Sequence, residues 1–256
     1  SLEGYEGVIL GGSNIWWGLS AKSLTTLTNI TWVNLATPAE SYSDVNYANF
    51  ISDTLSYSNR KDISFVIYSS SNFTDANRYN KRKVTTTDQY GKNKLSYKPQ
   101  RSFASYLKEF LGYTKYRPYP LENKYGDFGF SDYPCDTYKP TPLAPRDYMT
   151  INDLSMWLPG QLDRISGLFP NAKIILNIPN GFNGDKIWPN NDARSILIGK
   201  IKEILSNQVS ADERFSLISQ KPYPSSDLMC SDDYHANHNG REWHTKELHK
   251  LIEDQL

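Results

Sequence analysis

The fold follows from one segment near the N-terminus, Gly7-Val8-Ile9-Leu10-Gly11-Gly12-Ser13-Asn14. Its apolar part, Val8 to Leu10, has the continuous Val/Ile/Leu composition of a strand that is buried on both faces of a parallel sheet. Two glycines and a serine follow, and a helix-like stretch runs from Gly18 to Leu27. The segment therefore predicts a strand, a tight turn and a helix, with Ser13 exposed at the turn.

Four further apolar segments resemble this first strand and alternate with amphipathic segments. The predicted strands are Gly7–Leu10, Thr31–Leu35, Ile63–Tyr68, Lys173–Ile178 and Arg214–Ile218. The predicted helices are Leu19–Leu27, Asp44–Ser56, Ile151–Phe169, Asp192–Asn207 and Asn239–Ile252. Such alternation is typical of a parallel sheet with helices on both faces. We predict an α/β fold, a three-layer, doubly wound (flavodoxin-like) sheet of about five parallel strands.

Residues 73–150 interrupt this alternation. They contain no clear strand of the main sheet, and they are rich in Tyr, Lys, Arg and Pro. An irregular segment of this length within a compact domain is usually functional or disordered, and its aromatic content argues against disorder. We therefore predict a long Tyr-rich insertion after the third strand, forming a cap or lid over the sheet. Polar, Tyr-rich loops packed on the core are the alternative.

Composition excludes several classes of function. The 256 residues have a formal net charge of zero, which gives no electrostatic basis for binding nucleic acid. No apolar stretch reaches the roughly 20 residues that a membrane-spanning helix needs. With two cysteines and four histidines the chain has few zinc ligands, and we expect neither a metal nor a cofactor. Cys135 and Cys230 either pair or are both free thiols.

Polar residues follow several predicted strands at their carboxyl ends. Ser13 follows the first strand, the segment Asn34–Glu40 the second, Ser69–Asn72 the third, and Asp232 and His235 the last. Ligands of open α/β sheets bind at this edge. A serine, an imidazole and a carboxylate can act there as nucleophile, general base and orienting group.

These segments resemble the motifs of the SGNH (GDSL-type) hydrolase superfamily. Gly11-Gly12-Ser13-Asn14 stands where the family has Gly-Asp-Ser-Leu, and Asp232 and His235 match its Asp-x-x-His. Ala39 occupies the place of an oxyanion-hole glycine, and Asn72 matches the asparagine of Gly-x-Asn-Asp. The chain thus looks like a single SGNH-like α/β domain over residues 1–256, similar to carbohydrate esterase and polysaccharide O-acetyltransferase members.

The resemblance implies a role for each matched residue. Ser13 would attack an acyl carbon, His235 would accept and return its proton, and Asp232 would orient His235. The backbone N–H groups of Ser13 and Ala39, with the Asn72 side-chain amide, would bind the oxyanion. Ala39 departs from the family's glycine but keeps the N–H that the role needs.

Each assignment has an alternative. Ser13 could cap the first helix, and Asn72 could close an Asx turn after its strand. His238 competes with His235 as the base, and Asp233 competes with Asp232.

Trp16 and Trp17 follow the nucleophile directly. We expect them to line an acyl pocket or a sugar subsite, and core packing is the alternative. We expect His244 and His249 on the exposed face of the last helix.

The resemblance implies a serine-dependent acyl, in particular acetyl, ester hydrolase or O-acetyltransferase acting on a glycan or polysaccharide. A polar, Tyr-rich insertion differs from the broad apolar lid of a lipase.

The expected partners are an acylated glycan and, for a transferase, an acyl donor; the oligomeric state is left open. The alternative is a non-catalytic module for glycan binding or polysaccharide assembly. The chain begins almost at its first strand, like a domain of a longer, membrane-anchored O-acetyltransferase, and we expect it outside the bacterial cytoplasm, in the periplasm or at the cell surface.

Overall fold

A computed structural model describes residues 4–36, 60–70, 73, 124–127, 129, 151–178, 191–208, 213–230 and 235–256. Its strands form one parallel sheet in the order β2-β1-β3-β4-β5. The strands are β1 (Gly7–Gly11), β2 (Trp32–Asn34), β3 (Phe65–Ser69), β4 (Lys173–Asn177) and β5 (Phe215–Ile218). This is the flavodoxin-like order, and it confirms the predicted fold class.

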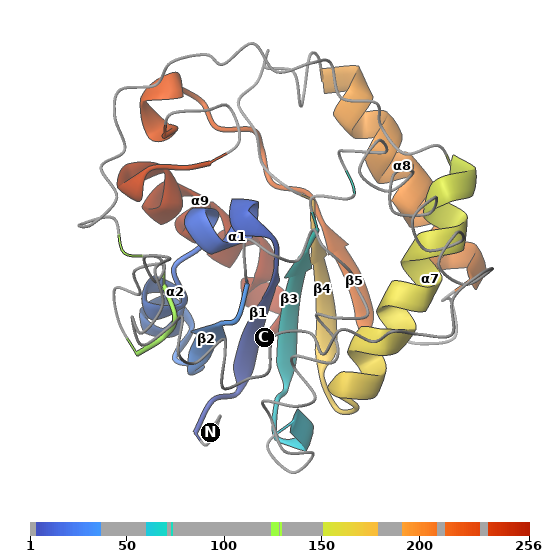
Figure 1. The fold of residues 1–256 in the computed structure, drawn as a ribbon, viewed down its shortest axis with the longest axis horizontal. Helices are drawn as coiled ribbons and strands as arrows, with labels where there is room; N and C mark the ends of the chain where they lie inside the picture. Colours follow the sequence, from blue (N-terminus) through green and yellow to red (C-terminus); the bar gives the residue numbers. More distant parts are fainter. Residues whose placement is uncertain are drawn as a thin grey trace, which may run out of the picture.

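Helices cover both faces of the sheet. The α-helices are α1 (Ser13–Gly18), α2 (Ala21–Thr28), α7 (Ile151–Leu168), α8 (Asn191–Gln208) and α9 (His238–Ile252). Two short 3-10 helices, η3 (Ser226–Leu228) and η4 (Glu253–Gln255), flank α9 in the chain. Figure 1 shows α7 and α8 on one side of the sheet and α1, α2 and α9 on the other.

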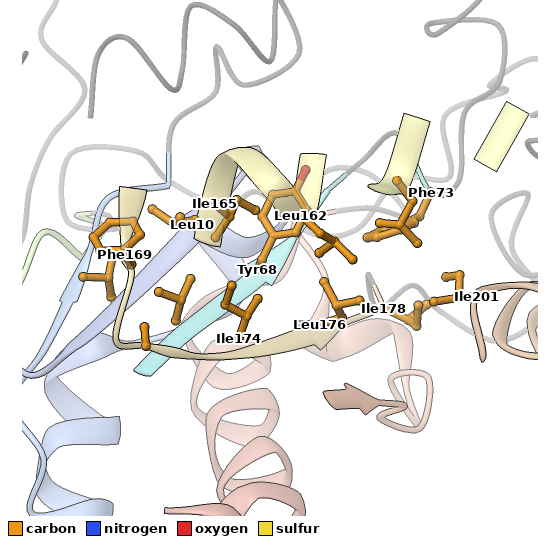
Figure 2. Close-up of a cluster of buried hydrophobic side chains, with 14 of the residues drawn as sticks. Leu10, Tyr68, Phe73, Leu162, Ile165, Phe169, Ile174, Leu176, Ile178 and Ile201 are labelled. Atoms are coloured by element: carbon orange, nitrogen blue, oxygen red, sulfur yellow. The ribbon is translucent and has the colours of Figure 1, made fainter. Parts of the chain in front are cut away.

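The sheet separates two hydrophobic clusters, because side chains of a strand point alternately to its two faces. Val8 and Leu10 of β1 belong to the cluster under α7 and α8, whereas Ile9 belongs to the cluster under α1, α2 and α9. Figure 2 shows the first cluster, in which Leu162 and Ile165 of α7 lie over the sheet. Strands buried on both faces explain the continuous apolar segments in the sequence.

The helix predicted over Leu19–Leu27 is in fact two helices. A six-residue helix, α1, begins at Ser13, and the chain is extended at Leu19 before α2 begins. Ser20 causes this break because its hydroxyl accepts a hydrogen bond from the backbone N–H of Ser23 (3.0 Å), which starts a new helix. The other helices of the described residues lie where they were predicted, and the predicted helix Asp44–Ser56 lies outside those residues.

Only parts of the predicted insertion, residues 73–150, are described: Phe73, residues 124–127 and Gly129. Residues 124–127 lie beside the edge strand β2, since the backbone N–H of Asn34 donates to the carbonyl of Tyr125 (2.7 Å). The cap itself stays a prediction. In the described part of the chain, no helix has the length and apolar composition to cross a bilayer.

Candidate active site

The turn after β1 places Ser13 at the carboxyl edge of the sheet. Gly11 has φ +149°, and a Cβ there would lie 2.1 Å from the carbonyl oxygen of Ser69, so no other residue fits without movement of the backbone. Asn14 holds the start of α1 onto β3 by donating its Nδ2 to Ser69 Oγ (3.3 Å). As the first residue of α1, Ser13 has a backbone N–H without a partner inside the helix.

His235 is the imidazole that meets Ser13. Its Nε2 lies 2.9 Å from Ser13 Oγ, although 222 positions separate the two residues in the chain. In the tautomer that carries its proton on Nδ1, Nε2 accepts this hydrogen bond from the serine hydroxyl. The contact has the geometry of a nucleophile and its general base.

The backbone of His235 is held by a short antiparallel pairing, which we call the His235 clasp. Met229 and Ala236 form an isolated β-bridge, and the N–H of Cys230 donates to the carbonyl of His235 (2.7 Å). The clasp holds the backbone of His235 against that of Met229 and Cys230. It thereby fixes the backbone from which the imidazole projects toward Ser13.

Asn237 joins the clasp to α9. Its Oδ1 accepts from the N–H of Gly240 (3.0 Å), so it caps the helix, and its Nδ2 donates to the carbonyl of Met229 (3.1 Å). His235 is therefore fixed from both directions, by the helix that follows it and by the strand segment that pairs with it.

The two tryptophans that follow Ser13 in α1 are both buried. Trp16 is 4% exposed and donates its Nε1–H to the carbonyl of Gly126 (3.3 Å). Trp17 is 9% exposed, and its ring centroid lies 4.9 Å from that of His235 at an interplanar angle of 41°. These contacts agree with the alternative prediction, in which both tryptophans pack in the core, and Trp17 packs against the imidazole of His235. A role in binding sugar stays a prediction for both.

The remaining predicted site residues lie outside the described part of the chain: Asp232, its competitor Asp233, Ala39 and Asn72. Ser70 and Phe73, the nearest described residues on either side of Asn72, are both buried. His238, the alternative base, is an exposed residue at the start of α9, and its Nδ1 lies 3.2 Å from Arg241 Nη2. The roles of Asp232, Ala39 and Asn72 stay predictions.

The prediction that His244 is exposed was wrong. Its side chain is 2% exposed and lies among the buried residues of α9, and His249 is half-buried. The sequence did contain a signal, because His244 is four and eight residues before the buried Leu248 and Ile252 and so shares their face of the helix. Burial lowers the pKa of His244 to about 3, the positive charge of Arg194 acts in the same direction, and a hydrogen bond with the Gly18 backbone opposes both.

Asp127 also has a role that the sequence did not suggest. Its carboxylate is buried at the start of α2, where it accepts from Ser20 Oγ (2.9 Å) and from the N–H groups of Ala21 (2.6 Å) and Lys22 (3.1 Å). A carboxylate at a helix N-terminus satisfies free N–H groups and interacts favourably with the helix dipole. Asp127 therefore fastens residues 124–127 to the helix pair that begins with Ser13.

Cys230, in the His235 clasp, is disulfide-bonded. Cys135, the chain's second cysteine, lies outside the described residues. Among the described residues, no group of three or more His, Cys, Asp and Glu side chains is placed to hold a metal ion.

No family model and no curated protein matches the sequence. Solved structures with a similar fold include the acetyl xylan esterase Est2A from the rumen bacterium Butyrivibrio proteoclasticus (10% identity, TM-score 0.48), which matches over 98% of this chain and 64% of its own. The lipase Lip_vut3 from a goat rumen metagenome matches over 96% of this chain and 97% of its own (9% identity, TM-score 0.46). A family two carbohydrate esterase from Clostridium thermocellum, in complex with cellohexaose, matches over 98% of this chain and 64% of its own (10% identity, TM-score 0.45).

This chain thus spans about two thirds of the length of the two carbohydrate esterases (64%). At these identities the likeness concerns the fold, and the chemistry of this chain is argued from its own residues. Those residues are a serine at the turn after β1 and an imidazole within hydrogen-bond distance of it.

Proposed function

We propose that this protein is a serine-dependent esterase that removes acetyl groups from a glycan. The observation that carries the proposal is the hydrogen-bond distance of 2.9 Å between Ser13 Oγ and His235 Nε2 at the carboxyl edge of the sheet. A serine hydroxyl is a weak nucleophile until a neighbouring base accepts its proton, and this contact supplies that base.

The reaction proceeds in two acyl-transfer steps. Ser13 Oγ attacks the carbonyl carbon of the ester while its proton moves to His235 Nε2. The tetrahedral intermediate then collapses, the bond between the carbonyl carbon and the sugar oxygen breaks, and His235 returns the proton to that oxygen. A water molecule next attacks the acetyl-serine, gives its proton to His235, and releases acetate as Ser13 Oγ recovers the proton.

Three further residues are proposed to assist these steps. Asp232 would hold His235 in the tautomer with its proton on Nδ1 and stabilise the imidazolium. The oxyanion would be bound by the N–H groups of Ser13 and Ala39 and by the Asn72 side chain. The loss of one such donor in a well-studied protease costs about 3 kcal/mol of transition-state stabilisation.

An acetylated glycan is the proposed substrate because the predicted insertion is polar and Tyr-rich, a composition suited to sugars. Acetylated xylan is a suitable first substrate, since an acetyl xylan esterase is among the solved structures of similar fold. Cellohexaose, bound in another of those structures, serves as the unacetylated oligosaccharide for binding experiments.

The proposal is tested by measuring acetate released from acetylated xylo-oligosaccharides and p-nitrophenol released from p-nitrophenyl acetate. We expect release by the wild type and none above background by Ser13→Ala. Ser206→Ala, which removes an exposed serine on α8, is the matched control and should retain full activity. Equal release by wild type and Ser13→Ala would show that Ser13 is not the nucleophile.

A second experiment separates the hydrolase from the transferase and from the non-catalytic alternative. The protein is incubated with an acetylated donor and an unacetylated oligosaccharide, and the sugars are analysed by mass spectrometry. A hydrolase yields acetate and no acetyl-oligosaccharide, whereas a transferase yields the acetylated sugar. Binding of cellohexaose without turnover of any ester would favour the glycan-binding module.

We also propose that the protein acts outside the bacterial cytoplasm. The disulfide at Cys230 supports this, because structural disulfides persist mainly in oxidising compartments. Immunolabelling of intact cells of the source organism tests it, and signal that appears only after the cells are broken would contradict it.

A further inference from the structure

A row of buried polar contacts runs beneath the candidate site, between α9 and the junction of α1 and α2. We call it the His244 seam. Its residues come from the segment after β5, from α9 and from the α1–α2 junction. Each of them is buried and contacts another residue of the seam. They are Gln220, Tyr223, His244, Thr245, Gly18 and Ser20.

Gln220 contacts both the backbone and the imidazole of His244. Its side-chain amide donates to the backbone carbonyl of His244 (2.9 Å), which leaves Oε1 facing the imidazole as an acceptor. His244 Nε2 lies within hydrogen-bond distance of this oxygen, and Nδ1 lies 3.2 Å from the hydroxyl of Tyr223.

The seam is electrically neutral. Burial holds His244 in its neutral form, with a pKa of about 3, and raises the pKa of Tyr223 above its usual value. A neutral hydrogen-bonded network in a low-dielectric interior is rigid, because breaking one hydrogen bond leaves a buried group without a partner.

On one side the seam contacts the helix of the nucleophile. The imidazole of His244 lies against Gly18, the last residue of α1, and a Cβ at Gly18 would be 3.1 Å from Nδ1 and 3.4 Å from the Tyr223 hydroxyl. Thr245 Oγ1 accepts from the N–H of Ser20 at 3.0 Å, two residues further along. Two successive residues of α9 thus hold the end of α1.

On the other side the seam contacts the clasp that holds the base. The ring of Tyr223 packs in a small buried cluster with Met229 and Ala236, the two residues that form the bridge beside His235. Tyr223 therefore contacts the His235 clasp through its ring and His244 through its hydroxyl. It connects the segment that carries the base to the helix that carries Ser13.

We propose that the His244 seam sets the distance between Ser13 and His235, with Tyr223, His244 and Gly18 as positioning residues of the site. None of them lies among the reacting groups. They act by fixing α1 relative to the His235 clasp, and the proposal rests on the proposed esterase function for its kinetic consequences. A displacement of about 1 Å in a catalytic constellation can lower a rate about 100-fold, so even a smaller shift has a measurable effect.

Two variants perturb the seam in opposite ways. Gly18→Ala adds a methyl group that meets His244 and pushes α1 away, and Tyr223→Phe removes one hydroxyl while keeping the ring in its cluster. Phe169→Leu is the control for lost stability, because Phe169 is buried in the cluster under α7 and α8, at the opposite end of the sheet from Ser13 (Figure 2).

We expect kcat for p-nitrophenyl acetate to fall about tenfold in both seam variants with KM unchanged, and to stay unchanged in Phe169→Leu at a comparable loss of thermal stability. Crystal structures of the variants give a readout that does not depend on activity. In the seam variants the distance from Ser13 Oγ to His235 Nε2 should be longer than the 2.9 Å of the wild type by a few tenths of an ångström, whereas Phe169→Leu should keep it.

The proposal is overturned if this distance is unchanged in both seam variants, or if kcat is unchanged although α1 has shifted. An inactive wild type would count against the esterase function alone, since the crystallographic comparison would still decide whether the seam positions the two residues. A fall in kcat of equal size in Phe169→Leu would assign the effect to stability and would also overturn the proposal.

Discussion

Ser13 Oγ and His235 Nε2 lie 2.9 Å apart, and a different structural element positions each of the two residues. Ser13 is presented by the glycine turn at the end of β1, whereas His235 is presented by the clasp before α9. In the proposed function the two residues are a nucleophile and its base that work through one hydrogen bond, so that loss of either residue removes what the other contributes.

The first prediction concerns this unit. Ser13→Ala and His235→Ala should each lower kcat/KM for p-nitrophenyl acetate by at least about 1,000-fold, and the double variant should lose no more than the more impaired single variant. Steady-state kinetics of the four proteins measures the coupling. Losses that multiply in the double variant would mean that the two residues act independently, contrary to their contact.

The sheet could be predicted from the sequence because each strand is a continuous apolar segment, and such segments are informative when both faces are buried. β1 and β4 differ from their predicted bounds by one residue each. The break between α1 and α2 could not be predicted in the same way. It depends on Ser20 and on its partner Asp127, which is 107 positions away in the chain.

The candidate site could also be predicted only in part. Ser13 and His235 could be proposed as site residues because each lies in a short local sequence motif. The His244 seam could not be predicted, because Gln220 and Tyr223 contact His244 at distances along the chain that no sequence pattern describes. The helical spacing between His244 and Leu248 did indicate that His244 is buried. The prediction of an exposed side chain was made because histidine is a polar residue.

The second prediction concerns Gly11. Gly11→Ala should lower the free energy of unfolding by at least about 3 kcal/mol, because the new Cβ would meet a backbone oxygen at 2.1 Å in addition to the strain of a positive φ. Gly4→Ala is the matched control: Gly4 also has a positive φ (+83°), but nothing lies within 4 Å of a Cβ there, so the cost should be about 1 kcal/mol. Urea unfolding of both variants separates the effect of the contact with the Ser69 carbonyl from the effect of the positive φ. Equal losses of unfolding free energy in the two variants would contradict the close approach of Gly11 to Ser69.

The third prediction concerns the buried carboxylate at the start of α2. Asp127→Ala leaves the N–H groups of Ala21 and Lys22 without their acceptor and should cost about 3 kcal/mol of unfolding free energy. Asp163→Ala, at an exposed position on α7, should stay within about 0.5 kcal/mol of the wild type. Chemical denaturation measures both, and a loss at Asp127 no larger than that at Asp163 would exclude the anchoring role.

The fourth prediction concerns pH. The pKa of His244 is about 3 in the folded protein, below its ordinary value of 6.5, so between these values the unfolded chain binds a proton that the folded protein does not. Stability from this group is fully present above pH 6.5 and falls by about 1.4 kcal/mol for each pH unit down to pH 3.

Replacement of His244 by Gln should flatten this part of the stability profile. Urea unfolding between pH 4 and pH 8 compares the variant with the wild type. By NMR, the ring protons of His244 should keep their chemical shifts across the same range. A titration near pH 6.5 would show that the imidazole is not held neutral.

The last prediction concerns the disulfide at Cys230, whose backbone N–H donates to the carbonyl of His235. Reduction frees a cysteine that is part of the His235 clasp, so it should loosen the base as well as destabilise the protein, by the roughly 2 to 4 kcal/mol typical of a native disulfide. Wild type treated with dithiothreitol and untreated Cys230→Ala should therefore show the same fall in thermal midpoint and in kcat. Cys230→Ala should not respond to the reductant, which controls for effects of the reductant elsewhere. Full activity of the reduced wild type, at a temperature where it is still folded, would show that the clasp holds His235 without the disulfide.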